Sequence, residues 1–460
     1  MIKNVLYINE VILGTAFGVL MGPYCADVLD PRSWGPTSNR ITLEVLRVVL
    51  VVGLFIIGVQ LPKRYLLEHL QGMLVMVIPT MAFGWVVIAI IINALFPSLS
   101  FVSSLAISAC LTPTDPIICS AIVGGKFAEK HVREDLRDIL SAESAANDGL
   151  AYPFLSLSLY LVLETSTKTA IGKWLLIGCL YQVILGTVLG ATLGLGFCKV
   201  MKFLYARDLL DPQSYPAQFV ALALLTGGLE SSLLTPSDIV LLTKVPDRFP
   251  LVIDTLLNCG CFIYIGAWLP FREFSSPDLG IAPWRLVVLF LAVLALRRIP
   301  PILLLYKWVH EIDGWQEALV AGHFGPMGVS ALFVSTMAIT TWLPPPHYPP
   351  QNQQEYLAAT LPTLVAFVVL GSIIVHGFSI SLFSLGRALR FMTRKRNPRN
   401  PTDDTESARA ESYWGPSLTT APTIPDSGSD KGVEQGSIRE SSGPRTPLWS
   451  SRPPSDIGKN

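Results

Sequence analysis

The sequence is poor in charge. Only 15% of its 460 residues are Asp, Glu, Lys or Arg, whereas 51% are hydrophobic, and the mean hydropathy is +0.49. Soluble domains usually carry more charge than this. The 34 basic and 34 acidic residues cancel, so no positive excess indicates nucleic acid as a partner. The composition indicates a membrane protein.

The cysteines do not form a framework for disulfides or zinc. They number seven, which is odd, and most lie inside apolar runs, as Cys110 and Cys119 do. Such residues are typically small buried hydrophobic side chains. Cys259 and Cys261 lack a second pair, which argues against a metal site there. We expect no resident metal ion and no cofactor.

Long apolar runs predict eleven membrane spans. A charged connector, Lys126–Asp138, separates the first four from the last seven, and three of its apolar residues could form one face of a surface helix, namely Phe127, Val132 and Leu136. The first span is short and lacks the basic start and cleavage site of a signal peptide. The spans are Ile8–Met21, Leu43–Gln60, Met73–Leu95, Phe101–Val123, Ile139–Leu163, Trp174–Met201, Ala217–Leu234, Val252–Leu269, Trp284–Tyr306, Val320–Leu343 and Ala358–Leu385.

The composition changes after Arg387. Residues 391–460 are rich in Ser, Pro, Thr, Asp and Arg, with almost no apolar periodicity, which predicts a disordered tail. We therefore divide the chain into a transmembrane domain, residues 1–390, and a tail, residues 391–460. Basic residues fill the connector and open the tail, so both are expected on the cytoplasmic side.

The motif LTPTDP interrupts the fourth span. Pro113 and Pro116 lack N–H groups and disfavour helical angles in the residues before them, so this span is predicted to be broken in its middle. A break frees backbone carbonyls, which are hard oxygen ligands for a small cation. The polar side chains of this break are Thr112, Thr114 and Asp115. The alternative is an ordinary loop between two surface segments.

A second polar stretch, AESAANDG, lies in the next span. Glu143 and Asn147 are four residues apart, as are Ser144 and Asp148, so each pair shares a helix face. A carboxylate at the centre of a membrane helix costs about 2.5–3.5 kcal/mol. That cost favours carboxylates that pair, face a wet cavity or carry ions. The alternative is a helix start at the membrane surface, with both carboxylates in water.

A third interruption, GHFGPMG at residues 322–328, opens the tenth span. Glycine and proline interruptions in two corresponding segments indicate a binding site at a repeat interface, and Gly325 and Pro326 lie at the centre of this one. The alternative is close helix packing at the glycines. His323 here and His376 in the last span are candidates for a proton relay, with a structural role as the alternative for each.

Together these motifs resemble the fungal plasma-membrane sodium (potassium)/proton antiporters of the cation/proton antiporter superfamily. TPTDP and ESAANDG carry the resemblance, with GPYCADVLDPRSWG, ALVAGHFGPMGVSA and SIIVHGFSI in the same order, and it covers most of Gly22–Leu385. It implies an all-α polytopic membrane protein with the inverted-repeat sodium/proton antiporter fold, in which two broken helices cross. It also implies a homodimer and a histidine at the position of His376.

The resemblance implies a secondary active antiporter, not an enzyme, that exchanges Na⁺, Li⁺ or K⁺ for H⁺ across the plasma membrane in cation and pH homeostasis. Asp148 would bind either a proton or a cation, never both. The oxygen ligands around it would be Asp115, Asn147, Thr114 and Thr112. Either Arg297 or Arg298 would reach inward and pair with Glu143; otherwise both arginines are anchors at the membrane surface.

The charge pattern contains one conflict. The connector and the tail are both basic, so both are expected on the cytoplasmic side. That needs an even number of membrane crossings between them, but seven spans are predicted there. The missing crossing is placed at Leu234–Val252, where the resemblance implies a further span with two adjacent acidic residues and this chain has only Asp238. It also implies a span ahead of residue 1. We expect a chain that lacks one or two spans, through mis-splicing or gene decay, and that transports poorly.

Three classes of function are therefore compared. The first is the antiporter. The second is an intramembrane aspartyl protease, which two membrane aspartates could serve, but the GxGD motif of that class is absent. The third is a non-transporting or degraded paralogue that senses cations or signals through its tail.

Overall fold

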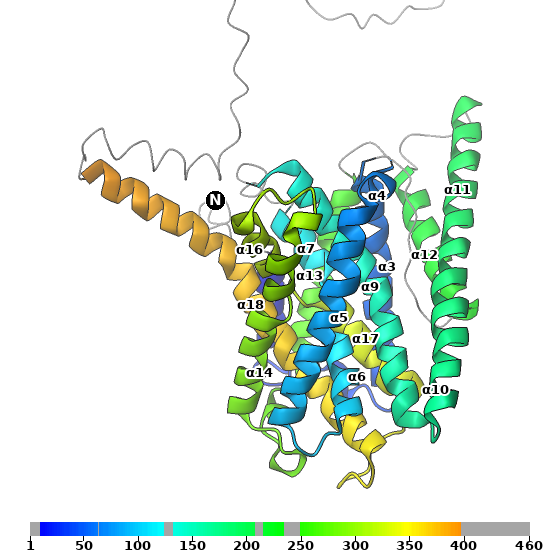
Figure 1. Ribbon diagram of the computed structural model, residues 1–460, viewed down its shortest axis with the longest axis vertical. Coiled ribbons are helices and arrows are strands. Elements are labelled where there is room, and N and C mark those ends of the chain that lie inside the picture. Colours follow the sequence, from blue (N-terminus) through cyan, green and yellow to red (C-terminus); the bar gives the residue numbers. More distant parts are fainter. Residues whose placement is uncertain (1–9, 63, 124–131, 208–214, 234–248, 397–460) are drawn as a thin grey trace, which may run out of the picture. The chain divides into compact units, whose positions relative to one another are not determined.

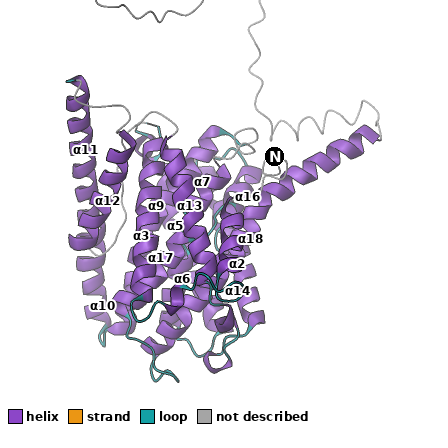
Figure 2. Cartoon of the chain, turned by 180° about the vertical axis from the view of Figure 1, so that it is seen from behind, coloured by secondary structure: helices purple, strands orange, loops and turns teal. Residues whose placement is uncertain are grey.

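The computed structural model describes residues 10–62, 64–123, 132–207, 215–233 and 249–396. Within these ranges every regular element is a helix (Figure 2), apart from one isolated bridge between Ser276 and Ile281. This confirms the all-α prediction. The elements are α2 (Glu10–Met21), η1 (Pro31–Ser33), α3 (Ser38–Gln60), α4 (Tyr65–Glu68), α5 (Leu70–Leu95), α6 (Phe101–Leu111), α7 (Pro116–Val123), α9 (Glu134–Leu163), α10 (Thr167–Lys173), η2 (Trp174–Ile184), α11 (Leu185–Ala206), α12 (Tyr215–Leu233), α13 (Phe249–Trp268), η4 (Phe271–Phe274), η5 (Pro277–Leu279), α14 (Pro283–Leu296), α15 (Ile299–Leu305), η6 (Tyr306–Trp308), α16 (Trp315–His323), α17 (Val329–Met337), η7 (Ala338–Trp342) and α18 (Gln353–Arg396).

The long apolar helices are those of a multi-pass membrane protein. Among the described residues, six helical segments are long and apolar enough to cross a bilayer: Ser38–Gln60, Leu70–Leu95, Phe101–Ser120, Thr167–Leu204, Pro283–Trp308 and Gln353–Ser379. Shorter apolar helices cover Glu10–Met21, Thr255–Trp268 and Val329–Trp342. Backbone groups in hydrocarbon must be satisfied within the segment itself, which is why these apolar runs are helical.

α9 is longer than the connector pattern predicts. It begins at Glu134, so Leu136 is buried in its first turn and does not belong to a separate surface helix. Phe127 lies outside the described residues. The helix also continues through AESAANDG, where Glu143 and Asp148 are both buried. The alternative of a helix start at the membrane surface is therefore wrong, because about four turns of helix precede Asp148.

Two helices are broken in the middle, as predicted. Residues 112–115 separate α6 from α7, and residues 324–328 separate α16 from α17. In Figure 1, α7 and α16 lie toward one end of the bundle and α6 and α17 toward the other, so the two broken helices run in opposite directions. Each is flanked by long helices, α5 and α9 for the first, and α14–α15 and α18 for the second. This is an inverted repeat.

The two sides of the bundle can be told apart in Figure 1. α7 and α18 both end at the side where α16 begins, so the flanks of the connector and the last described residues share one side. The predicted missing crossing at Leu234–Val252 falls largely on residues 234–248, outside the described residues, as does Asp238. Most of the predicted tail lies outside them too, since the description ends at Arg396.

Candidate functional site

One carboxylate joins the N-terminal ends of α7 and α17, the half-helices that follow the two breaks. Asp115 is fully buried in the first break; its Oδ1 accepts the Ile118 N–H of α7 at 2.8 Å, and its Oδ2 accepts the Ser330 N–H of α17 at 3.2 Å. Helix N-termini carry partial positive charge and free N–H groups. A single negative charge therefore satisfies both helix ends in a place where water is scarce.

The two breaks touch each other through the backbone. The Asp115 N–H donates to the Pro326 carbonyl at 2.7 Å, which fixes where the broken helices cross. Gly328 permits this approach, because a Cβ atom there would lie 2.7 Å from Asp115 Oδ2. Proline and glycine therefore both open the helix and make room for the carboxylate.

One guanidinium binds the C-terminal ends of α6 and α16, the half-helices that precede the two breaks. Arg297 lies between α14 and α15, and its Nη1 donates to the carbonyls of Leu111, Thr112 and Pro113 at 2.8, 3.1 and 3.0 Å. Its Nη2 donates to the Gly325 carbonyl. These carbonyls are the free C-terminal acceptors of α6 and α16. Positive charge at helix C-termini is the favourable arrangement.

The neighbouring arginine pairs with Glu143. Arg298 Nη1 and Nη2 donate to Glu143 Oε1 and Oε2 at 2.5 and 2.9 Å, and the two side chains are only 5% and 1% exposed. Arg298 Nε also donates to the Ala321 carbonyl of α16 at 3.0 Å. The expectation that one arginine reaches inward thus applies to Arg298, while Arg297 binds the breaks. Neither is a surface anchor, since both are buried.

Asn147 ties α9 to the first break. Its Nδ2 donates to Thr114 Oγ1 at 2.7 Å and to Glu143 Oε1 at 2.9 Å, and its Oδ1 accepts the Thr114 N–H at 3.1 Å. Asp148, the next residue, is also buried. The Thr112 hydroxyl instead donates to the Ala109 carbonyl of its own helix at 2.9 Å.

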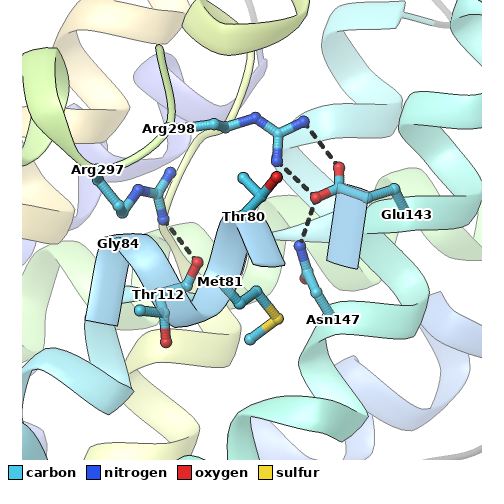
Figure 3. A pocket seen from close by; sticks show the side chains of 8 residues that line it. All are labelled: Thr80, Met81, Gly84, Thr112, Glu143, Asn147, Arg297 and Arg298. Carbon is cyan, nitrogen blue, oxygen red and sulfur yellow. Dashed lines mark hydrogen bonds and ion pairs between the residues drawn. The ribbon is translucent and has the colours of Figure 1, made fainter. Parts of the chain in front are cut away.

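A small pocket lies beside the ion pair (Figure 3). α5 contributes Thr80, Met81 and Gly84 to it, facing the Glu143–Arg298 pair. The full lining is Thr80, Met81, Gly84, Thr112, Glu143, Asn147, Arg297 and Arg298. Asp115 and Asp148 are not among these residues. Of the predicted oxygen ligands, Thr112 and Asn147 line the pocket, whereas Thr114, Asp115 and Asp148 do not. Asn147 connects the two groups through its bond to Thr114.

Both candidate histidines lie at the second break. His376 Nε2 is 3.0 Å from the His323 carbonyl, and its Nδ1 is 3.2 Å from Ser372 Oγ, which accepts the Met327 N–H at 2.7 Å. The two imidazole rings stack with centroids 5.3 Å apart. His323 Nε2 is 3.0 Å from Ser379 Oγ. α18 thus satisfies the backbone groups that the second break leaves free.

Some residues of the site were given no role by the sequence, although Ser330 and Ser372 lie inside the motifs ALVAGHFGPMGVSA and SIIVHGFSI. Ser330 and Ser372 act through a backbone N–H and a hydroxyl, and Gly84 makes room for Arg297, where a Cβ would lie 2.7 Å from its carbonyl. Ser372 precedes His376 by four residues, and this spacing, which puts both on one helix face, is a signal in the sequence. Within the described part of the chain, no group of three or more His, Cys, Asp or Glu side chains is arranged to hold a metal ion.

Two interrupted membrane helices that cross, with a buried carboxylate at the crossing, define the fold of a secondary ion transporter. The family model described as sodium/hydrogen exchanger, transmembrane, matches residues 1–241 and 246–385. The chain belongs to the sodium/hydrogen exchanger family.

Named relatives agree with this assignment. The chain is 41% identical over 412 residues to a probable Na⁺/H⁺ antiporter of Schizosaccharomyces pombe, covering 84% of this chain and 54% of that one. It is 36% identical over 435 residues to Na⁺/H⁺ antiporter 2 of Zygosaccharomyces rouxii, covering 89% and 54%. A second S. pombe Na⁺/H⁺ antiporter is 32% identical over 423 residues, covering 88% and 90%. The chain thus spans about half the length of the first two relatives and most of the third.

A solved structure has the same fold. The sodium/proton antiporter MjNhaP1 of Methanocaldococcus jannaschii superposes with a TM-score of 0.57 at 18% identity, covering 84% of this chain and 93% of that one. At this identity the likeness supports the fold of the helices and not the ion that they carry. It confirms the predicted antiporter fold.

Proposed function

We propose that this chain is a secondary active antiporter that exchanges Na⁺, and also Li⁺ or K⁺, for H⁺. The observation that carries the proposal is the link between α9 and the first break, in which Asn147 bonds Thr114 beside buried Asp148. It sets a carboxylate, an amide oxygen and a hydroxyl near a helix break, and hard cations prefer oxygen ligands.

The mechanism rests on competition for one carboxylate. Asp148 binds a proton or a cation, never both, so each cation carried one way is exchanged for a proton carried the other way. Asp115 and Thr114 are the further oxygen ligands that we assign, with Thr112 and Asp238 as candidates from the sequence. Asn147 sets the position of Thr114, and the Glu143–Arg298 pair holds α9 against α16. The two histidines hold the second break and are candidate proton carriers.

The proposed setting is the plasma membrane. The basic connector and the tail, residues 391–460, would be cytoplasmic, and residues 1–390 would form the transport domain. We propose a homodimer by analogy with the family, no catalytic activity, and the lipid bilayer as surroundings. The relatives are called Na⁺/H⁺ antiporters, which supports Na⁺ and H⁺ as substrates.

The test is Na⁺-driven proton flux in proteoliposomes that contain the full chain. An imposed Na⁺ gradient should move protons in the wild type, and Asp148→Asn should reduce the flux to background while insertion and folding persist. Asp278→Asn is the matched control, because that aspartate is exposed and lies in η5, outside both breaks and their flanking helix ends. Flux at the wild-type rate in Asp148→Asn would refute the assignment. No flux in the wild type would favour the non-transporting sensor.

A further inference from the structure

The pocket beside the ion pair is lined by hydrogen-bond donors that the protein does not use. Buried Arg298 has five N–H groups. Three of them donate to the Ala321 carbonyl and to the two Glu143 oxygens, and no described residue accepts from the other two. The Nε–H of buried Arg297 also has no acceptor among the described residues. Buried polar groups are almost always hydrogen-bonded, so these donors require an acceptor that the pocket can hold.

Thr80 brings an unused acceptor to the same pocket. Pro79 has no N–H, so the Val75 carbonyl loses its helical donor, and the Thr80 hydroxyl donates to that carbonyl at 3.3 Å. With its hydrogen used in this way, the Thr80 oxygen can only accept a further hydrogen bond. Thr80 is buried and lines the pocket together with Glu143 and Arg298 (Figure 3). The missing partner must therefore both accept and donate.

The charge and size of the pocket decide which ligand fits. Two guanidinium groups and one carboxylate line it, from Arg297, Arg298 and Glu143, which leaves one net positive charge. Like charges repel strongly in a buried site, so an alkali cation is disfavoured there. The space holds about one water molecule, and an ordered buried water needs about two to four polar partners. The ligand that meets these conditions is water.

We propose that this pocket binds one ordered water molecule and that Thr80 is a positioning residue that acts through it. The water accepts from Arg298 and donates to Thr80 and to Glu143 Oε2. It thereby connects α5 to the ion pair that holds α9 against α16. Asn147 lies one turn after Glu143 and binds both Glu143 and Thr114 of the first break. The effect on the cation site at that break rests on the proposed antiport function, whereas the water itself does not.

The first test needs no transport. A high-resolution cryo-EM map of the full chain should show one water-sized peak within hydrogen-bond distance of Thr80 Oγ1 and the Arg298 guanidinium. The peak should persist in Thr80→Ser and be lost in Thr80→Val. An empty pocket in the wild type, or an unchanged peak in Thr80→Val, would overturn the proposal. A peak that disappears when chloride is left out of the buffer would mean a bound anion and would overturn it as well.

The second test separates the water from the Val75 carbonyl. Pro79→Ala restores the helical donor of that carbonyl, so in this background Thr80→Val removes only the acceptor of the water. We expect Thr80→Val to lower the unfolding midpoint and to raise the KM for Na⁺ about tenfold, with kcat nearly unchanged, in both backgrounds. Thr80→Ser should behave as the wild type.

The matched control is Thr360→Val. The Thr360 hydroxyl is buried and donates to the Tyr356 carbonyl of its own helix at 2.8 Å, but Thr360 does not line the pocket. We expect no change in KM for Na⁺ in this variant. If Pro79→Ala cancels the effect of Thr80→Val, or if Thr360→Val raises KM equally, Thr80 has no positioning role. If the wild type does not transport, the map and the unfolding midpoints still decide whether the water is bound.

Discussion

The two helix breaks are stabilised by different chemistry. At the first, residues 112–115, the groups are a carboxylate, an amide and a hydroxyl, from Asp115, Asn147 and Thr114. At the second, residues 324–328, they are imidazole and serine groups, from His376 and Ser372, while the Arg297 guanidinium binds carbonyls at both breaks. Only the first set contains anionic and neutral oxygens suited to an alkali cation. We infer that the first break binds ions, whereas the second is held fixed.

Breaking the ion pair between the two repeats should have the largest effect. Glu143→Gln or Arg298→Gln leaves one buried charge without its partner and should destabilise the fold by about 3–5 kcal/mol. Thermal unfolding in detergent, followed in both single variants and in the double variant, measures this. We expect strong coupling, so that the double variant loses less than the sum. Purely additive losses would mean that the pair contributes nothing beyond two separate side chains.

Crowding the Asp115 carboxylate from the second break should have a smaller effect. Gly328→Ala would place a methyl group 2.7 Å from Asp115 Oδ2 and force the carboxylate to shift. The expected loss of stability is about 1–3 kcal/mol, as for other overpacked sites, together with weaker Na⁺ affinity. Gly314→Ala is the matched control, since no atom lies within 4 Å of a Cβ there. If the two variants have equal stability and affinity, Gly328 does not position Asp115.

Weakening the second break should change stability without changing ion selectivity. Ser372→Ala removes the acceptor of the Met327 N–H, which costs about 1–3 kcal/mol when a buried donor is left unsatisfied. The ratio of Na⁺ to Li⁺ transport rates should stay as in the wild type. A changed ratio would show that the second break also contacts the cation, and would remove the contrast between the two breaks.

Deleting the tail should have the smallest effect. Residues 397–460 contain too little apolar sequence to offset the entropy of ordering them. The unfolding midpoint of a chain that ends at Arg396 should match that of the full chain. A clear fall would show that the tail docks on the transport domain.

Both breaks could be predicted from the sequence, because proline and glycine act on the backbone locally. Pro113, Pro116 and Pro326 remove N–H groups wherever they stand, and the structure has breaks at those positions. The partner of Glu143 could not be predicted in the same way, since Arg298 is 155 residues away. Two adjacent arginines look alike in sequence, and the helix ends between them, so they point to different partners.

Other features escaped prediction because their role depends on three-dimensional neighbours. Gly84 and Gly328 act by having no side chain next to a charged residue from another helix. Clustered proline and glycine predict the two breaks, whereas the single prolines Pro79, Pro153 and Pro362 lie inside continuous helices, and packing decides which charges meet.

The central claim is that a proton and a cation compete for Asp148. The most direct measurement is calorimetric Na⁺ binding to the purified chain in detergent at two pH values about one unit apart, with proton release recorded in weak buffer. We predict that the apparent Kd rises by up to about tenfold for each unit that the pH falls, with proton release on binding, and that Asp148→Asn binds no Na⁺. Na⁺ binding that is independent of pH, or that survives in Asp148→Asn, would contradict the claim.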